Sequence, residues 1–178
     1  ERGGLGESMR WFYKHFPAEP YYGWLADDLR PRTKGWDIDL ARDATPNNFV
    51  CCNDDWMAHN PQTRFLIQSG KDMCGALCWG GDLVRAVGWW MPPFIKHDQV
   101  SADTCWCVIL APTGRFRYRH DIIVEHLNWR TRKRERDAVD ALSARHDATT
   151  QEDLQAVGAW ITGGDAAQAI MRIYELGR

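Results

Sequence analysis

The stretch Tyr21-Tyr22-Gly23-Trp24-Leu25-Ala26-Asp27-Asp28 decides the fold of this chain, because an apolar, aromatic run ends there in two adjacent carboxylates. Pro20 and Pro31 bound the run, which predicts a short buried β-strand over residues 21–25. In open α/β sheets, ligands bind at the carboxyl ends of strands. Two adjacent carboxylates repel each other unless a cation lies between them, and their hard oxygen atoms suit Mg²⁺ or Mn²⁺. The alternative is an acidic turn, since Asp is common in turns.

Hydrophobic patterning on both sides of this strand predicts a mixed α/β domain. An apolar helix is expected over residues 5–16, ended by Pro17, because proline disrupts a helix interior. We expect further strands over residues 49–52 and 116–124. Helices are expected over residues 82–87, from Asp98 or Ser101 through residue 109, over 130–142 and over 150–176, with 38–42 a short helix or loop and 64–68 a further strand candidate. The glycines of 161–165 are expected to divide the last helix.

Length and composition bound the protein's class. With 178 residues the chain is expected to form a single domain, with an α/β core over residues 1–128 and helices over 129–178. A formal net charge of −2 gives no overall attraction to nucleic acid or membrane. The apolar runs are too short to span a bilayer, so the expected location is the cytoplasm and no membrane partner is expected. Six cysteines lack zinc-site spacing and are interpreted as small buried hydrophobic residues.

Four motifs follow one another in order along the chain. They are Trp24–Asp37, which contains Arg-Thr-Lys-Gly-Trp-Asp; Gly88-Trp89-Trp90-Met91-Pro92-Pro93; His97-X5-Asp103-X2-Trp106; and Tyr118-X2-Asp121-X3-Glu125-His126. Over residues 20–128 this succession resembles the nucleotide-sugar glycosyltransferases with the A-type fold, in particular the small ones of phage and bacterial genomes. The resemblance implies a partial or reduced A-type fold and a divalent metal.

The resemblance assigns the acidic strand end to the metal and the diphosphate. Asp28 is expected to contact the ion, and Asp27 the ion or the ribose. His126 and Glu125 are further metal candidates, and an imidazole ligand would favour Mn²⁺ over Mg²⁺. Arg30 and Arg32 are expected to grip the diphosphate. The alternatives are a histidine that is hydrogen-bonded at a strand end and solvated arginines in a loop.

A second group of residues is expected at the acceptor. Asp103 is the candidate base for the acceptor hydroxyl, with Asp98 as the alternative. Either carboxylate could instead cap a helix. His97 is expected to orient a phosphate or the carboxylate. The side chains of Trp89, Trp90 and Trp106 could form a stacking floor for the acceptor, or could belong to the core.

Two further features concern what lies around the site. Only about one helix precedes Asp27, whereas a complete A-type enzyme first builds the strands that bind the nucleotide base. The chain also lacks an initiating Met, so we expect a processed, trimmed or incomplete product. Without upstream strands, residues 21–25 would form an exposed sheet edge that invites association. A second acidic strand end, Asn53-Asp54-Asp55, could form another site at a strand edge, but a capped turn is the preferred interpretation.

Residues 115–136 hold eight Lys or Arg against three Asp or Glu. Such a stripe would suit a polyanionic acceptor such as DNA with a hydroxymethylated base, although a solvated helical face is the commoner explanation. The leading hypothesis is therefore transfer of a sugar from a nucleotide-sugar donor to an acceptor hydroxyl of a glycan or modified DNA. The alternatives are a non-catalytic binding module, and a metal-dependent nucleotidyltransferase or phosphohydrolase.

Overall fold

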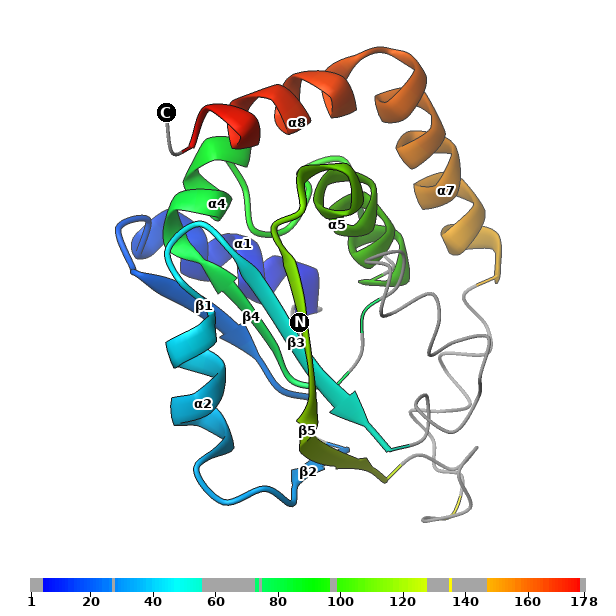
Figure 1. The fold of residues 1–178 in the computed structure, drawn as a ribbon. Helices are drawn as coiled ribbons and strands as arrows, with labels where there is room; N and C mark the ends of the chain where they lie inside the picture. Colours follow the sequence, from blue (N-terminus) through cyan, green and yellow to red (C-terminus); the bar gives the residue numbers. More distant parts are fainter. Residues whose placement is uncertain are drawn as a thin grey trace.

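A computed structural model describes residues 5–26, 28–55, 73, 75–96, 99–127, 135 and 147–176. In these residues helices surround a curled mixed sheet (Figure 1). The elements are α1 (Leu5–His15), β1 (Tyr21–Trp24), β2 (Leu29–Pro31), α2 (Trp36–Asp43), β3 (Phe49–Asp54), β4 (Leu77–Gly80), α4 (Gly81–Val87), α5 (Gln99–Thr113), β5 (Phe116–His126), α7 (Asp147–Thr162) and α8 (Asp165–Glu175). The α/β prediction is confirmed.

The sheet has five strands in the order β1-β4-β3-β5-β2. Strand β4 is antiparallel to both β1 and β3, while β3 and β5 are parallel. Strands β1, β3 and β5 therefore run in the same direction, and their carboxyl ends meet at one end of the sheet. Strand β2 closes the other edge by pairing antiparallel with the end of β5. The predicted strand over 21–25 is found as β1, at a sheet edge as expected. Its predicted burial is wrong in part, because Tyr21, Gly23 and Leu25 are exposed and only Tyr22 is fully buried.

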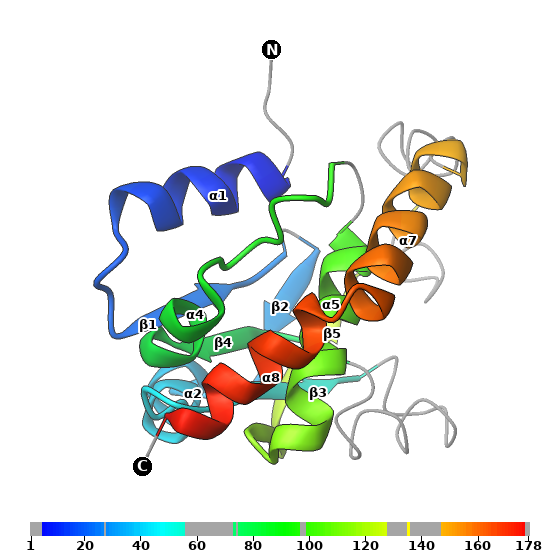
Figure 2. The ribbon, with the colours of Figure 1, turned by 90° about the horizontal axis from the view of Figure 1, so that it is seen from above.

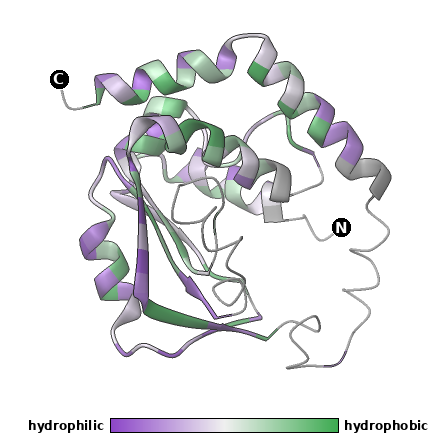
Figure 3. Ribbon diagram, turned by 45° about the vertical axis from the view of Figure 1, so that its right-hand side comes forward, coloured by the Kyte–Doolittle hydropathy of each residue, from purple (hydrophilic) through white to green (hydrophobic). Residues whose placement is uncertain are grey.

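Helices cover the two faces of the sheet unequally. The larger core lies between the sheet and α1, α4, α5, α7 and α8, and contains Tyr22, Trp79 and Trp106. The smaller core lies on the other face, where Leu40 of α2 packs near Val50 and Ile122. Figure 2 shows α1 and α2 on opposite sides of the strands. In Figure 3 the helix α5 is largely hydrophobic, as an interior helix must be, whereas the outer helix α2 is mostly hydrophilic.

An irregularity in the pairing of β3 with β5 decides which face the end of β5 presents. Up to Cys52 opposite Arg119 the register is continuous, and it resumes with Asn53 opposite Ile123. The extra residues in β5 reverse the alternation, because successive side chains in a strand point to opposite faces. Phe116 therefore packs into the larger core and Val124 into the smaller one.

Several expectations are confirmed and two boundaries need correction. Helix α1, strands β3 and β5, and the division of the last helix by Gly163 and Gly164 agree with the sequence analysis. Helix α4 begins at Gly81, one residue before the predicted start at residue 82, with Gly80 as N-cap and no side-chain cap. Helix α7 begins at Asp147, before the predicted start at residue 150. The predicted strand over 64–68 lies outside the described residues, as does nearly all of the predicted helix over 130–142.

The cysteines of the described residues are free thiols, as the spacing predicted. Cys51, Cys52, Cys78 and Cys105 are buried. Burial raises the pKa of Cys78 to about 11 and that of Cys105 to about 12, which keeps both in the unreactive thiol form. Within the described residues no helix has both the length and the apolar character needed to cross a bilayer.

Candidate active site

Acidic side chains and a histidine gather where the three strands of common direction end. Asp54 is the last residue of β3 and His126 the last residue of β5. Asp28 lies just before β2, in the loop that follows β1. The pairing of Leu29 with His126 brings this loop against the end of β5, and the Leu127 N–H donates to the Asp28 carbonyl at 2.7 Å. This is the end of the sheet at which α/β proteins bind ligands.

His126 lies between two carboxylates and contacts one with each ring nitrogen. Its Nδ1 is 2.6 Å from Asp54 Oδ2, and its Nε2 is 3.1 Å from Asp28 Oδ2. The Asp54 side chain is 2% exposed, while those of His126 and Asp28 are 19% and 22% exposed. The Asp54 side of the imidazole is thus buried, whereas the Asp28 side is open to solvent.

Neighbouring groups fix the position and raise the basicity of this imidazole. Asp55 accepts a hydrogen bond from the His126 backbone N–H at 2.9 Å, which holds the end of β5 beside the end of β3. The hydrogen bond with Asp54 raises the pKa of His126 above its ordinary value, and the charges of Asp54 and Asp28 act in the same direction. Desolvation lowers this pKa but is outweighed.

The donor set of this cluster suits a divalent cation only in part. A carboxylate held on Nδ1 directs Nε2 outward, which is the arrangement of metal-binding histidines with an orienting carboxylate. Nε2 and Asp28 Oδ2 then offer one nitrogen and one oxygen donor from neighbouring positions. Among the described residues no group of three His, Cys, Asp or Glu side chains is placed to hold a metal ion. The predicted ligand Asp27 lies outside them.

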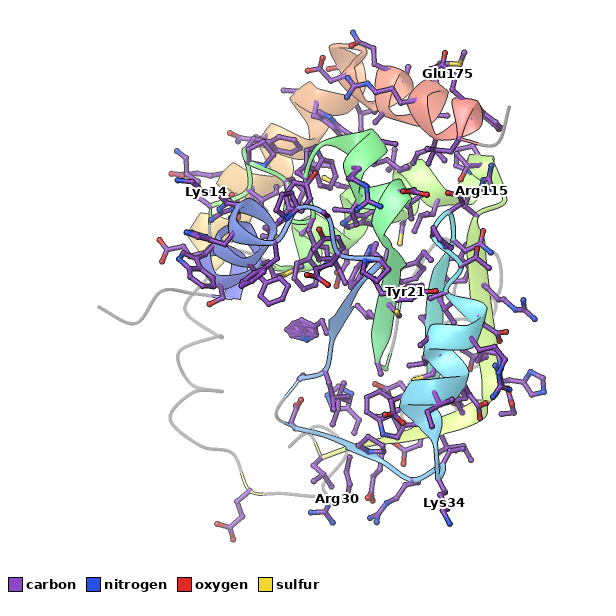
Figure 4. The ribbon with its side chains drawn as sticks, turned by 90° about the vertical axis from the view of Figure 1, so that its left-hand side faces the viewer. Lys14, Tyr21, Arg30, Lys34, Arg115 and Glu175 are labelled. Atoms are coloured by element: carbon purple, nitrogen blue, oxygen red, sulfur yellow. The ribbon has the colours of Figure 1, made fainter. Side chains whose placement is uncertain are left out.

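The two predicted diphosphate arginines lie at this end of the molecule, in and after β2. Arg32 forms an ion pair with Glu125, whose role as a metal ligand stays a prediction. The Arg32 side chain is still 51% exposed. Arg30 is exposed on β2, opposite Glu125. Figure 4 shows Arg30 and Lys34 together at the lower end of the molecule, away from Arg115 and Glu175.

The predicted acceptor residues have mixed outcomes. Trp90 and Trp106 are 6% and 1% exposed, and Trp106 Nε1–H donates to the Trp90 carbonyl at 2.9 Å. Both belong to the larger core, which was the alternative to a stacking floor. Trp89 is partly buried against Trp106. Asp103 lies in α5, whereas Asp98 and His97 lie outside the described residues, so the predicted base and its neighbours stay predictions.

The sequence analysis ranked a strand-edge site at Asp54 and Asp55 below a capped turn. Their stretch was interpreted as a capped turn, yet Asp54 is buried against His126. The signal that could have found them was present. Two apolar strands that each end in Asp-Asp place both acidic pairs at the same end of a sheet when the strands run in the same direction.

No protein-family model, curated protein or solved structure matches this chain.

Proposed function

We propose that this protein transfers a sugar from a nucleotide-sugar donor to an acceptor hydroxyl, with a divalent ion bound by Asp28 and His126. The observation that carries the proposal is the imidazole held between Asp54 and Asp28 at the carboxyl ends of β1, β3 and β5. The ordered motifs of residues 20–128 supply the second support. The corresponding fold assignment is a reduced glycosyltransferase A-type domain.

The chain's own residues divide the work at this site. Asp54 keeps a proton on Nδ1, so Nε2 is free to bind an ion once Asp28 turns its oxygen toward the same ion. Donor phosphate oxygens and water would complete the coordination, as is usual for ions that act on nucleotide phosphates. The bound ion would offset the charge that gathers on the departing diphosphate.

Arg30 and Arg32 lie at the same end of the sheet as the proposed ion but on the strand face of Glu125, so they would bind phosphates that extend past the end of the strand. Arg30 is exposed, and Arg32 keeps half of its side chain in solvent while paired with Glu125. A guanidinium can bind two phosphate oxygens at once, and Glu125 fixes the position of one such group. Asp103 remains the proposed base for the acceptor hydroxyl, in an inverting transfer.

Donor hydrolysis tests the proposal without knowledge of the acceptor. We would incubate the purified chain with a panel of uridine- and guanosine-diphosphate sugars and measure nucleoside diphosphate release, with Mn²⁺ or with chelator. Turnover should require the metal. It should fall at least about 100-fold in Asp28→Asn and His126→Gln, because each removes a proposed ligand.

The control is Glu175→Gln, an exposed carboxylate at the end of α8 and outside the four motifs, which should retain turnover. Equal activity of Asp28→Asn and wild type would contradict the proposal. Binding of donor or DNA by a folded chain that never releases nucleotide would favour the non-catalytic binding module. Release of pyrophosphate or of a nucleoside monophosphate would favour nucleotidyl transfer or phosphohydrolysis.

A further inference from the structure

The outer edge of β1 is a regular, uncharged strand edge. The Gly81 N–H donates a hydrogen bond to the Pro20 carbonyl at 2.7 Å, which makes Pro20 and Gly81 a hydrogen-bonded pair. Since hydrogen-bonded pairs alternate along an antiparallel ladder, Tyr22 and Trp24 direct their backbone groups toward β4. The backbone groups of Tyr21 and Gly23 consequently point away from the sheet. Among the described residues no strand pairs with this side of β1.

Exposed aromatic side chains lie beside this edge. They belong to α1, to β1 and to the segment after each: Trp11 (57% exposed), Phe12 (40%), Phe16 (43%), Tyr21 (37%) and Leu25 (40%). Ring contacts join Trp11 to Phe16 and Phe12 to both Phe16 and Tyr22, which places the α1 aromatics beside the strand on the face of Tyr22. Tyr21 and Leu25 lie along the same edge on the opposite face. We call β1 and these residues the β1 edge patch. Figure 4 shows α1 beside β1 and the position of Tyr21 on it.

The opposite edge of the sheet is different. Strand β2 reads Leu29-Arg30-Pro31 and is followed by Arg32. Cations and proline are the devices by which natural sheets prevent edge-to-edge pairing. Residues 21–25 contain no charge and no proline, and β1 pairs with β4 without a bulge. The β2 edge is thus protected against pairing with a further strand, whereas the β1 edge can accept a further strand.

We propose that the β1 edge patch binds the same patch of a second copy of this chain, with the two β1 strands antiparallel about a two-fold axis. In a two-fold symmetric pair of strands, the residue on the axis lies opposite its own copy. Residues that lie opposite each other in an antiparallel pair place their side chains on the same face of the sheet. Pairing Gly23 with Gly23 of the second copy meets both conditions. It also brings together the backbone N–H and C=O groups that point away from the sheet in each copy. Tyr21 then faces Leu25 of the second copy on either side of the glycines, and these side chains cover the space that the glycines leave.

The size of the patch sets the strength of the dimer. Given the total area of large side chains, the exposed parts of these five residues amount to roughly 450 Å² per copy. With the strand backbone added, the two copies together would bury on the order of 1,000 Å². Stable complexes bury somewhat more, so we infer a reversible dimer at micromolar concentrations rather than an obligate one. The inference is independent of glycosyl transfer.

Sedimentation equilibrium of the whole chain across micromolar concentrations tests the dimer. Wild type should pass reversibly from monomer to dimer. Tyr21→Lys places a charge on the edge while the core residue Tyr22 stays in place, and should weaken the dimer at least about tenfold. Ile38→Lys, at a 62% exposed site on α2, should leave it unchanged. Only monomer at all concentrations, or an equal dimer in Tyr21→Lys, would overturn the proposal.

A cysteine at the centre of the interface tests the register. Gly23→Cys should give a cross-linked dimer under mild oxidation, because paired residues of antiparallel strands lie at the Cα separation of a disulfide. There is room for the side chain, since a Cβ at Gly23 would meet only the Leu77 carbonyl oxygen, at 3.7 Å. Ile38→Cys is the control for random collisions. Equal cross-linking of the two variants, or a monomer that instead binds phosphatidylglycerol vesicles through the patch, would contradict the second copy as its occupant.

Discussion

His126 is the residue on which the site depends, since three aspartates converge on it. Asp54 and Asp28 contact its two ring nitrogens and Asp55 contacts its backbone. The imidazole carries a proton on both nitrogens only in its charged form, and that form donates to both carboxylates. Without metal the cluster therefore stabilises imidazolium, which explains the direction of its pKa shift.

This shift predicts a pH dependence of the metal-free fold. The pKa of His126 is higher in the folded state than in the unfolded chain, so its charged form favours folding. That contribution is fully present below the unfolded pKa of about 6.5 and is lost as the pH rises through the folded pKa. Urea denaturation in chelator from acidic to mildly alkaline pH should show the loss in wild type and a smaller one in Asp54→Asn.

The control for this measurement is Asp37→Asn, which should keep the pH profile of wild type because Asp37 is exposed on α2. The chemical shifts of the His126 ring give a second readout, and its midpoint should move to lower pH in Asp54→Asn. An identical midpoint in both proteins would show that Asp54 does not set the basicity of this histidine.

The sequence identified Asp28 and His126 correctly as residues of one cluster, because each ends or follows an apolar run. It ranked a strand-edge site at Asp54 below a capped turn, because a strand followed by Asn-Asp-Asp looks like any capped turn until the strand direction is known. The assignment of Glu125 to the metal stays a prediction, and the surroundings of Glu125 differ from those of His126. Adjacent residues in a strand point to opposite faces, so Glu125 and His126 diverge, and Arg32 pairs with the former.

At the scale of elements, the junction of β4 with α4 depends on close backbone contacts. The Gly80 N–H donates to the Asn48 carbonyl at 2.8 Å, and the Gly81 N–H donates to the Pro20 carbonyl. A Cβ at Gly80 would overlap the carbonyl oxygens of Thr45 and Pro46, which are backbone atoms and cannot move aside. This contact with the loop before β3 is the reason why position 80 requires a glycine.

Two matched glycine substitutions test this account. Gly80→Ala should destabilise the protein by roughly 2–4 kcal/mol, because overpacking against backbone is relieved only by moving a strand. Gly158→Ala, at an exposed site in α7 with no described atom within 4 Å of the new Cβ, should stabilise it by about 0.5–1 kcal/mol. Urea denaturation gives both values, and a neutral Gly80→Ala would mean that the loop before β3 can shift freely.

At the scale of the whole molecule, the larger core joins residues from both ends of the chain. Met9 of α1, Trp79 of β4 and Ile173 of α8 belong to the same buried cluster. Side-chain hydrogen bonds to backbone carbonyls at the end of the chain add to this. The Arg115 guanidinium donates to the Leu176 carbonyl at 2.5 Å, and the Tyr174 hydroxyl donates to the Pro112 carbonyl at 2.6 Å. The C-terminal helices α7 and α8 thus contribute residues to the core that supports the sheet.

This connection predicts that loosening α8 lowers the stability of the entire chain. Ile173 is fully buried, so Ile173→Ala should cost roughly 2–4 kcal/mol and lower Tm by roughly 5–15 °C. Met171 lies two residues earlier on the same helix and is 58% exposed, so Met171→Ala should change stability by less than about 0.5 kcal/mol. Far-UV circular dichroism and tryptophan fluorescence should give the same midpoint in Ile173→Ala. Loss of helix signal before the fluorescence of the buried tryptophans changes would instead mean that α7 and α8 unfold independently. Elements that share one core are expected to unfold in a single cooperative transition.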